Sequence, residues 1–349
     1  MMQPAEWCRH DAVWLAWPSH EDLWLEQLAP VQQAFVEFCE AIVAPSANSA
    51  VQAERLEILC PPRRQPEAQR RLGHLNPRFH DIPFGDIWLR DTAPVFVHDA
   101  AGAVCAASFR FNGWGGKYEL DGDGDLSQAV AAASTLPTTR HSFVLEGGAV
   151  ESDGAGTLLT TEQCLLNPNR NPGMARAAIE QRLIDTLGAR KVLWLRRGLQ
   201  NDHTDGHVDT LARFVAPGRV IAMEPNGRDD PNAEVLHEIL QDLSRMRTAD
   251  GEDFEIISIP SPGAVHDAQG KLMAASYVNF YISNRGVAVP EYGAPGRSGL
   301  SDSDKEAVES IAALFPGRRT VGVRARELLA GGGAFHCISQ QQPAARSQA

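Results

Sequence analysis

The chain has 349 residues, of which 43% are hydrophobic and 22% are charged, as is ordinary for a soluble globular protein. Its formal net charge of −12 excludes nucleic acid and anionic membrane surfaces as general partners and favours a small cationic ligand. The first 24 residues lack the basic and apolar regions of a secretion signal, and no stretch approaches the roughly 20 apolar residues of a membrane span. We therefore expect a cytoplasmic protein without a membrane partner.

Short apolar runs alternate with helical patterns and with Gly or Pro breaks, and this alternation predicts an α/β fold. The expected strands cover 12–17, 55–60, 88–97, 103–111, 156–161, 191–195, 208–215, 219–223, 254–260, 274–283 and 286–290. The expected helices cover 22–44, 121–134, 173–187, 231–247 and 302–315. Ser301 or Ser303 can cap the last helix, whose first turn is acidic. No linker divides the chain, so we expect one domain over 1–343 and a disordered tail at 344–349.

Several familiar motifs fail on their spacing. Asp121, Asp123 and Asp125 alternate as in a calcium loop, but the Gly and Glu that an EF-hand needs further on are absent. The three glycines at 331–333 lie too close to the chain end for a dinucleotide-binding βαβ unit, so we expect them to bring the backbone near another group. The six cysteines form no Cys-x-x-Cys pair, which predicts reduced thiols and no zinc or iron–sulfur centre.

Polar residues interrupt the apolar pattern at three places. Asp91 follows Arg90 within an expected strand, and Glu146 lies between a short apolar run and two glycines. In the segment NDHTDGHVD, His207 and Asp209 flank Val208, so on a strand they would share a face. A solvated turn is the ordinary explanation for each place. Metal binding would need a third and a fourth ligand, and the chain offers no His-rich partner for the pair.

Cysteine is usually a small buried hydrophobe, so Cys337 taken alone indicates little. Together with the acids it suits one chemistry better than metal binding. A planar guanidinium presents five N–H donors in a fork that carboxylates match. Asp91, Glu146, His207, Asp209 and Cys337 could hold such a cation and attack its central carbon.

Ordered segments over nearly the whole chain carry a family resemblance. They are WLAWP (14–18), WLRDTAPVFV (88–97), FRFNGWGGKY (109–118), LEGGAV (145–150), GTLLTTEQCLLNPNRNP (156–172), TDGHVDTLARFV (204–215), SYVNFYISNRGVAVPEYG (276–293) and HCISQQQP (336–343). The sequence resembles the agmatine deiminase family, also called Porphyromonas-type peptidylarginine deiminases, of the guanidine-modifying superfamily. The resemblance implies a pseudo-fivefold α/β propeller of ββαβ-type modules around a central channel. It also implies that no metal or organic cofactor is needed, and a homodimer would be typical of the family.

The resemblance assigns roles to the same five residues. Cys337 matches the nucleophile, His207 the general acid and base, and Asp91 and Asp209 the carboxylates that hold the guanidinium. Glu146 matches the acid that supports the histidine and the substrate. The implied reaction is the hydrolysis of agmatine to N-carbamoylputrescine and ammonia through a covalent amidino-cysteine intermediate.

The substrate tail is less strongly indicated. Trp88, Trp114 and Asp86 are candidate channel-lining residues, because a tryptophan face suits an aliphatic or cationic tail. His203 stands where the family often has an aspartate, and this departure makes agmatine specificity less secure than deiminase chemistry. Peptidylarginine and free arginine are alternative substrates. A non-catalytic binder of guanidino or polyamine ligands is the alternative of another class, which has no need of a nucleophile.

Overall fold

Five small sheets form the framework of the computed structural model, which describes residues 1–46, 50–293 and 301–346. The strands of the first sheet lie in the order β16 (Gln340–Pro343), β1 (His10–Ala16), β2 (Arg55–Leu59) and β3 (Arg78–His80). The second sheet contains β4 (Val95–His98), β5 (Val104–Arg110) and β6 (Thr138–Val144), and the third contains β7 (Glu151–Ser152), β8 (Thr157–Thr161) and β9 (Lys191–Leu195). The fourth contains β10 (Ala212–Ala216), β11 (Arg219–Glu224) and β12 (Glu255–Pro260), and the fifth contains β13 (Tyr281–Ile282), β14 (Gly286–Glu291) and β15 (Arg319–Arg324).

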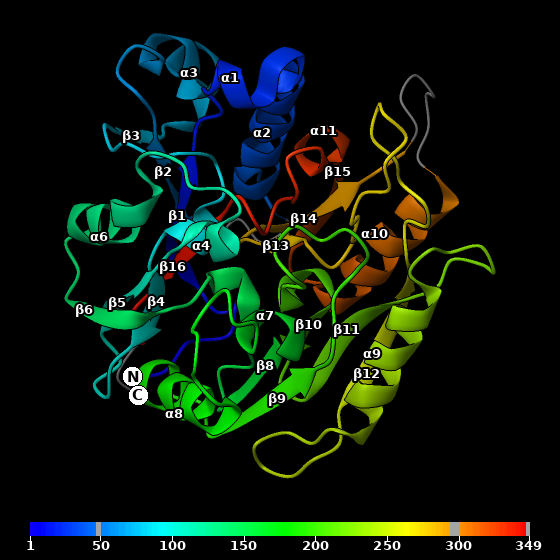
Figure 1. Ribbon diagram of the computed structural model, residues 1–349. Coiled ribbons are helices and arrows are strands. Elements are labelled where there is room, and N and C mark those ends of the chain that lie inside the picture. The colour runs from blue at the N-terminus through cyan, green and yellow to red at the C-terminus, as the bar shows by residue number, and fades with distance from the viewer. Residues whose placement is uncertain (47–49, 294–300, 347–349) are drawn as a thin grey trace.

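One pattern repeats in all five sheets. In the order given above, the first strand of each sheet pairs antiparallel with the second, and the second strand pairs parallel with the third. A parallel connection needs a long crossover. In the five modules this crossover contains a helix: α2 (Leu28–Val43), α6 (Asp123–Ser134), α8 (Arg176–Leu187), α9 (Ala233–Arg245) and α10 (Asp302–Leu314). The additional parallel pair of the first sheet, β2 with β3, is connected through α3 (Gln65–Leu72). Figure 1 shows these helices around the outside and the sheets toward the centre. The predicted α/β propeller of ββαβ modules is confirmed.

The two ends of the chain close the ring. The C-terminal strand β16 pairs antiparallel with β1, so the first module takes its first strand from the end of the sequence. The labels of the two termini accordingly lie together in Figure 1. Of the expected tail, residues 344–346 are described: Ala344 N–H donates to Arg9 and Arg346 N–H donates to Gly102. Residues 347–349 lie outside the described residues, and the single domain over 1–343 remains a prediction.

The helix predictions hold with small changes at the ends. Ser301 caps α10 with a reciprocal capping box to Asp304. The expected helix at 22–44 is divided, because Leu25 has φ +47° and separates α1 from α2. The shorter helical segments are α1 (Glu21–Trp24), η1 (Leu25–Gln27), α3 (Gln65–Leu72), η2 (Gly73–Leu75), α4 (Leu89–Thr92), α5 (Gly113–Gly116), η3 (Gly147–Ala149), α7 (Glu162–Leu165), η4 (Val208–Thr210) and α11 (Arg326–Leu329).

Three strand predictions are wrong in a way that matters for the site. Asp91 lies in α4 and not on a strand. His207 and Asp209 lie at a 3-10 turn before β10, so a shared strand face does not explain their proximity. Within 274–283 only Tyr281–Ile282 form a strand. The β-branched and apolar residues in these segments are buried in turns that enter the centre of the ring, where tertiary packing outweighs local preference. Five strands, β3, β6, β7, β15 and β16, were not predicted.

The core fixes the segment that carries Cys337. Phe335, two residues before it, stacks on Phe38 of α2 with the ring centroids 4.9 Å apart, and neither ring is exposed. This packing holds the last loop against the first module and so limits where the Cys337 side chain can point. None of the helices in the described residues has the length and the apolar character needed to cross a lipid bilayer.

Candidate active site

Every module sends polar side chains to the centre from the turn just before its first strand. Asp91 precedes β4, Glu146 precedes β7, His207 and Asp209 precede β10, Asn279 precedes β13, and Cys337 precedes β16. The pseudo-fivefold arrangement brings these five turns together, although they are spread over almost 250 residues of sequence. The structure therefore places all five predicted catalytic residues in one buried region, and it adds Asn279.

The thiol of Cys337 lies between an amide and a carboxylate. Asn279 Nδ2 is 3.1 Å from Sγ, and Asp209 Oδ2 is 3.5 Å from it. Asn279 Oδ1 also accepts from the backbone N–H groups of Ala334, at 3.2 Å, and Cys337, at 3.4 Å. Burial, followed by the charges of Asp209 and Asp91, raises the pKa of the Cys337 thiol well above its ordinary value. Without a bound cation the sulfur is therefore a neutral thiol.

Asp91 and His207 meet above Gly148. His207 Nδ1 is 3.6 Å from Asp91 Oδ1, and the same oxygen accepts from Gly148 N–H at 2.9 Å. Burial raises the pKa of Asp91, while His207 opposes this change. Burial lowers the pKa of His207, but Asp91, Cys164 and other acidic neighbours outweigh it and raise this pKa well above its ordinary value. The neighbouring groups therefore favour the imidazolium form of His207 beside the Asp91 carboxylate.

Trp114 holds the other oxygen of Asp91. Its indole Nε1 donates to Asp91 Oδ2 at 2.8 Å. To do so, Trp114 adopts φ +52° and ψ +47°, a left-handed conformation that is rare for a bulky residue. Backbone strain of this kind persists only where the surroundings impose it, and it clusters at functional sites.

Glu146 is anchored by a buried arginine. Arg170 Nε donates to Glu146 Oε1 at 2.6 Å, and Arg170 also pairs with Asp205 at 2.5 Å. Neither the Arg170 side chain nor that of Glu146 is exposed. The carboxylate therefore keeps a fixed orientation next to His207 and Cys164. A ring nitrogen of His207, the sulfur of Cys164 and an oxygen of Glu146 all lie within 4.8 Å of one another. No role was predicted for Cys164 from the sequence.

Several polar atoms of these residues lack a hydrogen-bond partner within the described part of the chain. They are Glu146 Oε2, both ring nitrogens of His207 and Asp209 Oδ1, and all are buried. Buried polar atoms are rarely left unsatisfied, and those that are call for an explanation such as a ligand or a water. Glu146, His207 and Asp209 thus each have a buried polar atom that is available to hydrogen-bond a ligand or a water.

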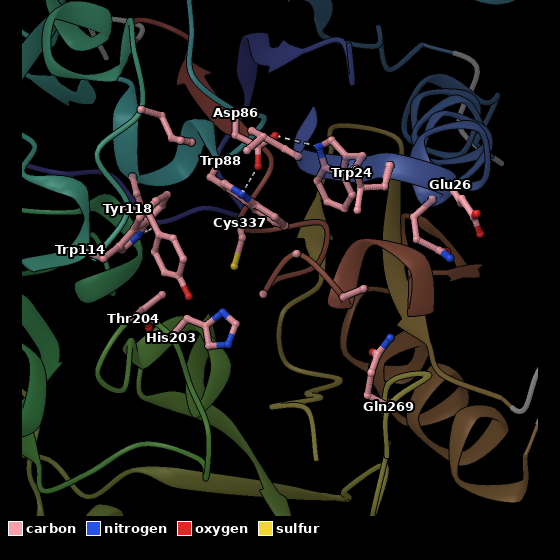
Figure 2. A pocket seen from close by; sticks show the side chains of 18 residues that line it. Trp24, Glu26, Asp86, Trp88, Trp114, Tyr118, His203, Thr204, Gln269 and Cys337 are labelled. Carbon is pink, nitrogen blue, oxygen red and sulfur yellow. Dashed lines mark hydrogen bonds between the residues drawn. The ribbon is translucent and has the colours of Figure 1, made fainter. Parts of the chain in front are cut away.

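A cavity of about 870 Å³ leads to this centre. The predicted tail-binding residues Asp86, Trp88, Trp114 and His203 all line it, together with Asp91 and Cys337. Figure 2 shows the sulfur of Cys337 pointing into the open space between these side chains. The lining does not include Glu146, His207 or Asp209, which lie beneath it with at most 1% exposure.

Two tryptophans and an aspartate form one wall of the cavity. The indoles of Trp24 and Trp88 donate to separate oxygens of Asp86, each at 2.9 Å (Figure 2). Burial raises the pKa of Asp86, and these donors oppose it. Trp24 and Tyr118 also line the cavity but were missed, because a lone aromatic residue near a helix end does not differ in sequence from a core residue.

The glycines before Cys337 allow the backbone to pass close to neighbouring side chains, as predicted. A Cβ at Gly331 would lie 2.4 Å from Trp24, and one at Gly333 would lie 2.8 Å from both Trp88 and Cys337. Gly332 has φ +112°, and a Cβ there would lie 3.2 Å from His203. Only glycine lets this loop pass between the wall of the cavity and the thiol.

Five ββαβ modules around a centre that holds a thiol, an imidazole and carboxylates define the class: an α/β propeller with a central site for a planar cation. A family model described as Porphyromonas-type peptidyl-arginine deiminase matches residues 2–343. The agmatine deiminase of Pseudomonas aeruginosa (strain LESB58) is 36% identical over 366 residues, which cover 98% of this chain and 95% of the relative. The chain belongs to the Porphyromonas-type peptidyl-arginine deiminase family.

Two further similarities agree with this assignment. The agmatine deiminase of Ectopseudomonas mendocina (strain ymp) is 36% identical over 367 residues, again with 98% of this chain and 95% of the relative covered. The solved structure of the agmatine deiminase of Enterococcus faecalis is 32% identical with a TM-score of 0.88. That similarity covers 98% of this chain and 95% of the solved one.

Proposed function

We propose that this protein is an agmatine deiminase, a hydrolase that converts agmatine and water to N-carbamoylputrescine and ammonia. The observation that carries the proposal is that Cys337 and Asp91 line one cavity and Asp209 lies beneath it, with the thiol 3.5 Å from Asp209 Oδ2. Two carboxylates and a sulfur in this arrangement suit a flat cation whose central carbon is to be attacked. Relatives of similar length carry the name agmatine deiminase.

The proposed reaction has two halves. Asp91 and Asp209 hold the guanidinium nitrogens, and the bound cation lowers the pKa of the Cys337 thiol, so that the thiol releases its proton to solvent and thiolate forms in the complex. Thiolate attacks the guanidinium carbon, the C–N bond breaks, and His207, an imidazolium in the free enzyme, gives its proton to the departing ammonia. The neutral imidazole then takes a proton from water as the oxygen attacks the amidino-thioether, and the C–S bond breaks. Glu146, fixed by Arg170, orients His207.

The lining of the cavity favours agmatine over free arginine. Glu26, Asp86 and Asp91 face the cavity, whereas the described lining residues include no Lys or Arg. An α-carboxylate is usually bound by such a cation, so arginine would enter an acidic cavity with its own anion unpaired. Agmatine carries a terminal ammonium in place of the α-carboxylate. This cation would be stabilised by the acids of the lining and by the indole faces of Trp24 and Trp88.

The test compares ammonia release from agmatine, free arginine and a peptidylarginine. We expect agmatine to be the preferred substrate, and Cys337→Ser to abolish turnover without loss of folding. Cys8→Ser is the matched control, because it removes an exposed thiol from the same chain. Ammonia release that persists in Cys337→Ser would rule out the covalent route. No turnover of any guanidine by the wild type would favour the non-catalytic binder.

The homodimer and the cytoplasmic location remain predictions of the sequence. The reaction as proposed needs neither a metal ion nor an organic cofactor, because the thiol, the imidazole and water supply every bond that forms. Light scattering at several protein concentrations would test the dimer.

A further inference from the structure

A network of buried charges lies directly behind Asp209 and Cys337. Its centre is Glu6, which precedes β1 and is 5% exposed. Glu6 Oε1 accepts from Arg90 at 3.0 Å, His336 Nε2 at 2.9 Å and Gln341 at 3.1 Å. Glu6 Oε2 pairs with Arg213. These partners come from the first, second and fourth modules, so Glu6 joins elements that carry catalytic residues.

His336 links this network to the active site. Its Nδ1 is 2.7 Å from Asp209 Oδ2, and its Nε2 is 2.9 Å from Glu6 Oε1. An ionised carboxylate can only accept a hydrogen bond, so both ring nitrogens must donate. His336, which is not exposed to solvent, is therefore an imidazolium held between two carboxylates. Burial alone would raise the pKa values of both acids, but their cationic partners outweigh it and lower them.

We infer that His336 is a positioning residue for catalysis, held by Glu6, which orients Asp209 and compensates its negative charge beside the nucleophile. The inference rests on the proposed function, in which Asp209 holds the substrate cation. His336 occupies Asp209 Oδ2, so Asp209 Oδ1, which has no partner within the described residues, stays free for a guanidinium N–H. The same Oδ2 lies 3.5 Å from Cys337 Sγ, where an uncompensated anion would oppose thiolate formation.

Other charged groups also act on Glu6 and Asp209, and they are unchanged in the test below. They are Arg90 and Asp91 of α4, Glu151 of β7, His207 before η4, and Arg213 of β10. Arg213 donates to Glu151 at 2.8 Å and pairs with Glu6, so its charge is already shared between two acids. His336 is the cation whose ring contacts the Asp209 carboxylate directly.

The test uses two replacements of the same residue. His336→Asn keeps an N–H donor near the position of Nδ1 but removes the positive charge and the link to Glu6. His336→Ala removes the donor as well. Loss of a charged hydrogen bond should lower kcat/KM for agmatine by about 10- to 100-fold in His336→Ala, and less in His336→Asn. In His336→Asn the acid limb of the kcat/KM profile should move to higher pH, because Asp209 becomes easier to protonate.

A second readout does not depend on turnover. Alkylation of Cys337 by iodoacetamide, followed by peptide mass spectrometry at pH 8, should slow by about tenfold in His336→Asn, since one pKa unit changes the thiolate fraction tenfold. If the wild type deiminates no guanidine, this readout still tests the positioning role. His10→Asn is the control: His10 is a buried histidine whose Nδ1 lies 3.7 Å from a carboxylate oxygen of Glu54. It should leave the acid limb and the alkylation rate unchanged.

A folded His336→Asn with the wild-type acid limb and the wild-type alkylation rate would overturn the inference.

Discussion

Gly148 offers a direct test of the geometry of the site. A Cβ added there would lie 2.7 Å from His207 Nδ1, 2.9 Å from Asp91 Oδ1 and 3.0 Å from Asp209 Oδ2. Ordinary contact with a Cβ begins near 3.4 Å, so the His207 ring would have to move by roughly 0.7 Å. The backbone of Gly148 does not have a positive φ, so alanine is conformationally acceptable at this position. The substitution Gly148→Ala should therefore act only by displacing the side chains of His207, Asp91 and Asp209.

The expected magnitude follows from that displacement. A misplacement of about 1 Å in an active site can cost about 100-fold in rate, so Gly148→Ala should lower kcat/KM by between about 10- and 100-fold. In free energy this loss is about 1.4 to 2.7 kcal/mol of transition-state stabilisation. Overpacking should also destabilise the fold by about 1–3 kcal/mol, which thermal unfolding would detect.

The matched control is Gly124→Ala in α6, where an added Cβ has no neighbour within 4 Å. Ammonia release from agmatine should be unchanged in this variant. The reasoning would be refuted if Gly148→Ala kept kcat/KM within about twofold of the wild type, because Asp91, His207 and Asp209 would then not depend on their present positions. An equal loss in both variants would point to a general effect of alanine and not to the site.

Three further outcomes are expected. Asn279→Ala removes the donor to Cys337 and should lower kcat/KM by about tenfold in a steady-state assay; unchanged kinetics would contradict the contact. Because the pKa of Cys337 is raised, its alkylation by iodoacetamide in the free enzyme should accelerate about tenfold per pH unit from pH 7 to 9, whereas a plateau at pH 7 would disagree. Ser301→Ala should cost about 1 kcal/mol in denaturant unfolding by removing the cap of α10, with turnover unaffected.

The sequence predicted the main helices because each carries its own period and end signals. The capping of α10 by Ser301 is an example, since the cap and the acidic first turn lie within a few residues of each other. The strands were harder to place. Asp91, His207 and Asp209 sit in turns whose buried residues look like strand residues when read in isolation.

The catalytic set was predicted from residue types and from a family resemblance, and the structure brings these residues together. Asn279 and His336 were not predicted. Asn279 lies in an apolar segment, and nothing local distinguishes it from an amide that caps a turn. His336 is adjacent to Cys337 in sequence, but its meaning depends on Glu6, which is 330 residues away.

The sequence by itself determined which chemistry the chain can perform, because a thiol, an imidazole and carboxylates are fixed by the order of amino acids. It also determined the helices, whose signals are local. Only the tertiary structure decided that five turns from five modules meet at one centre, that Gly148 has no space for a side chain, and that one imidazole lies between two acids. These features arise from contacts between residues far apart in the chain, and local sequence preferences carry no record of such contacts.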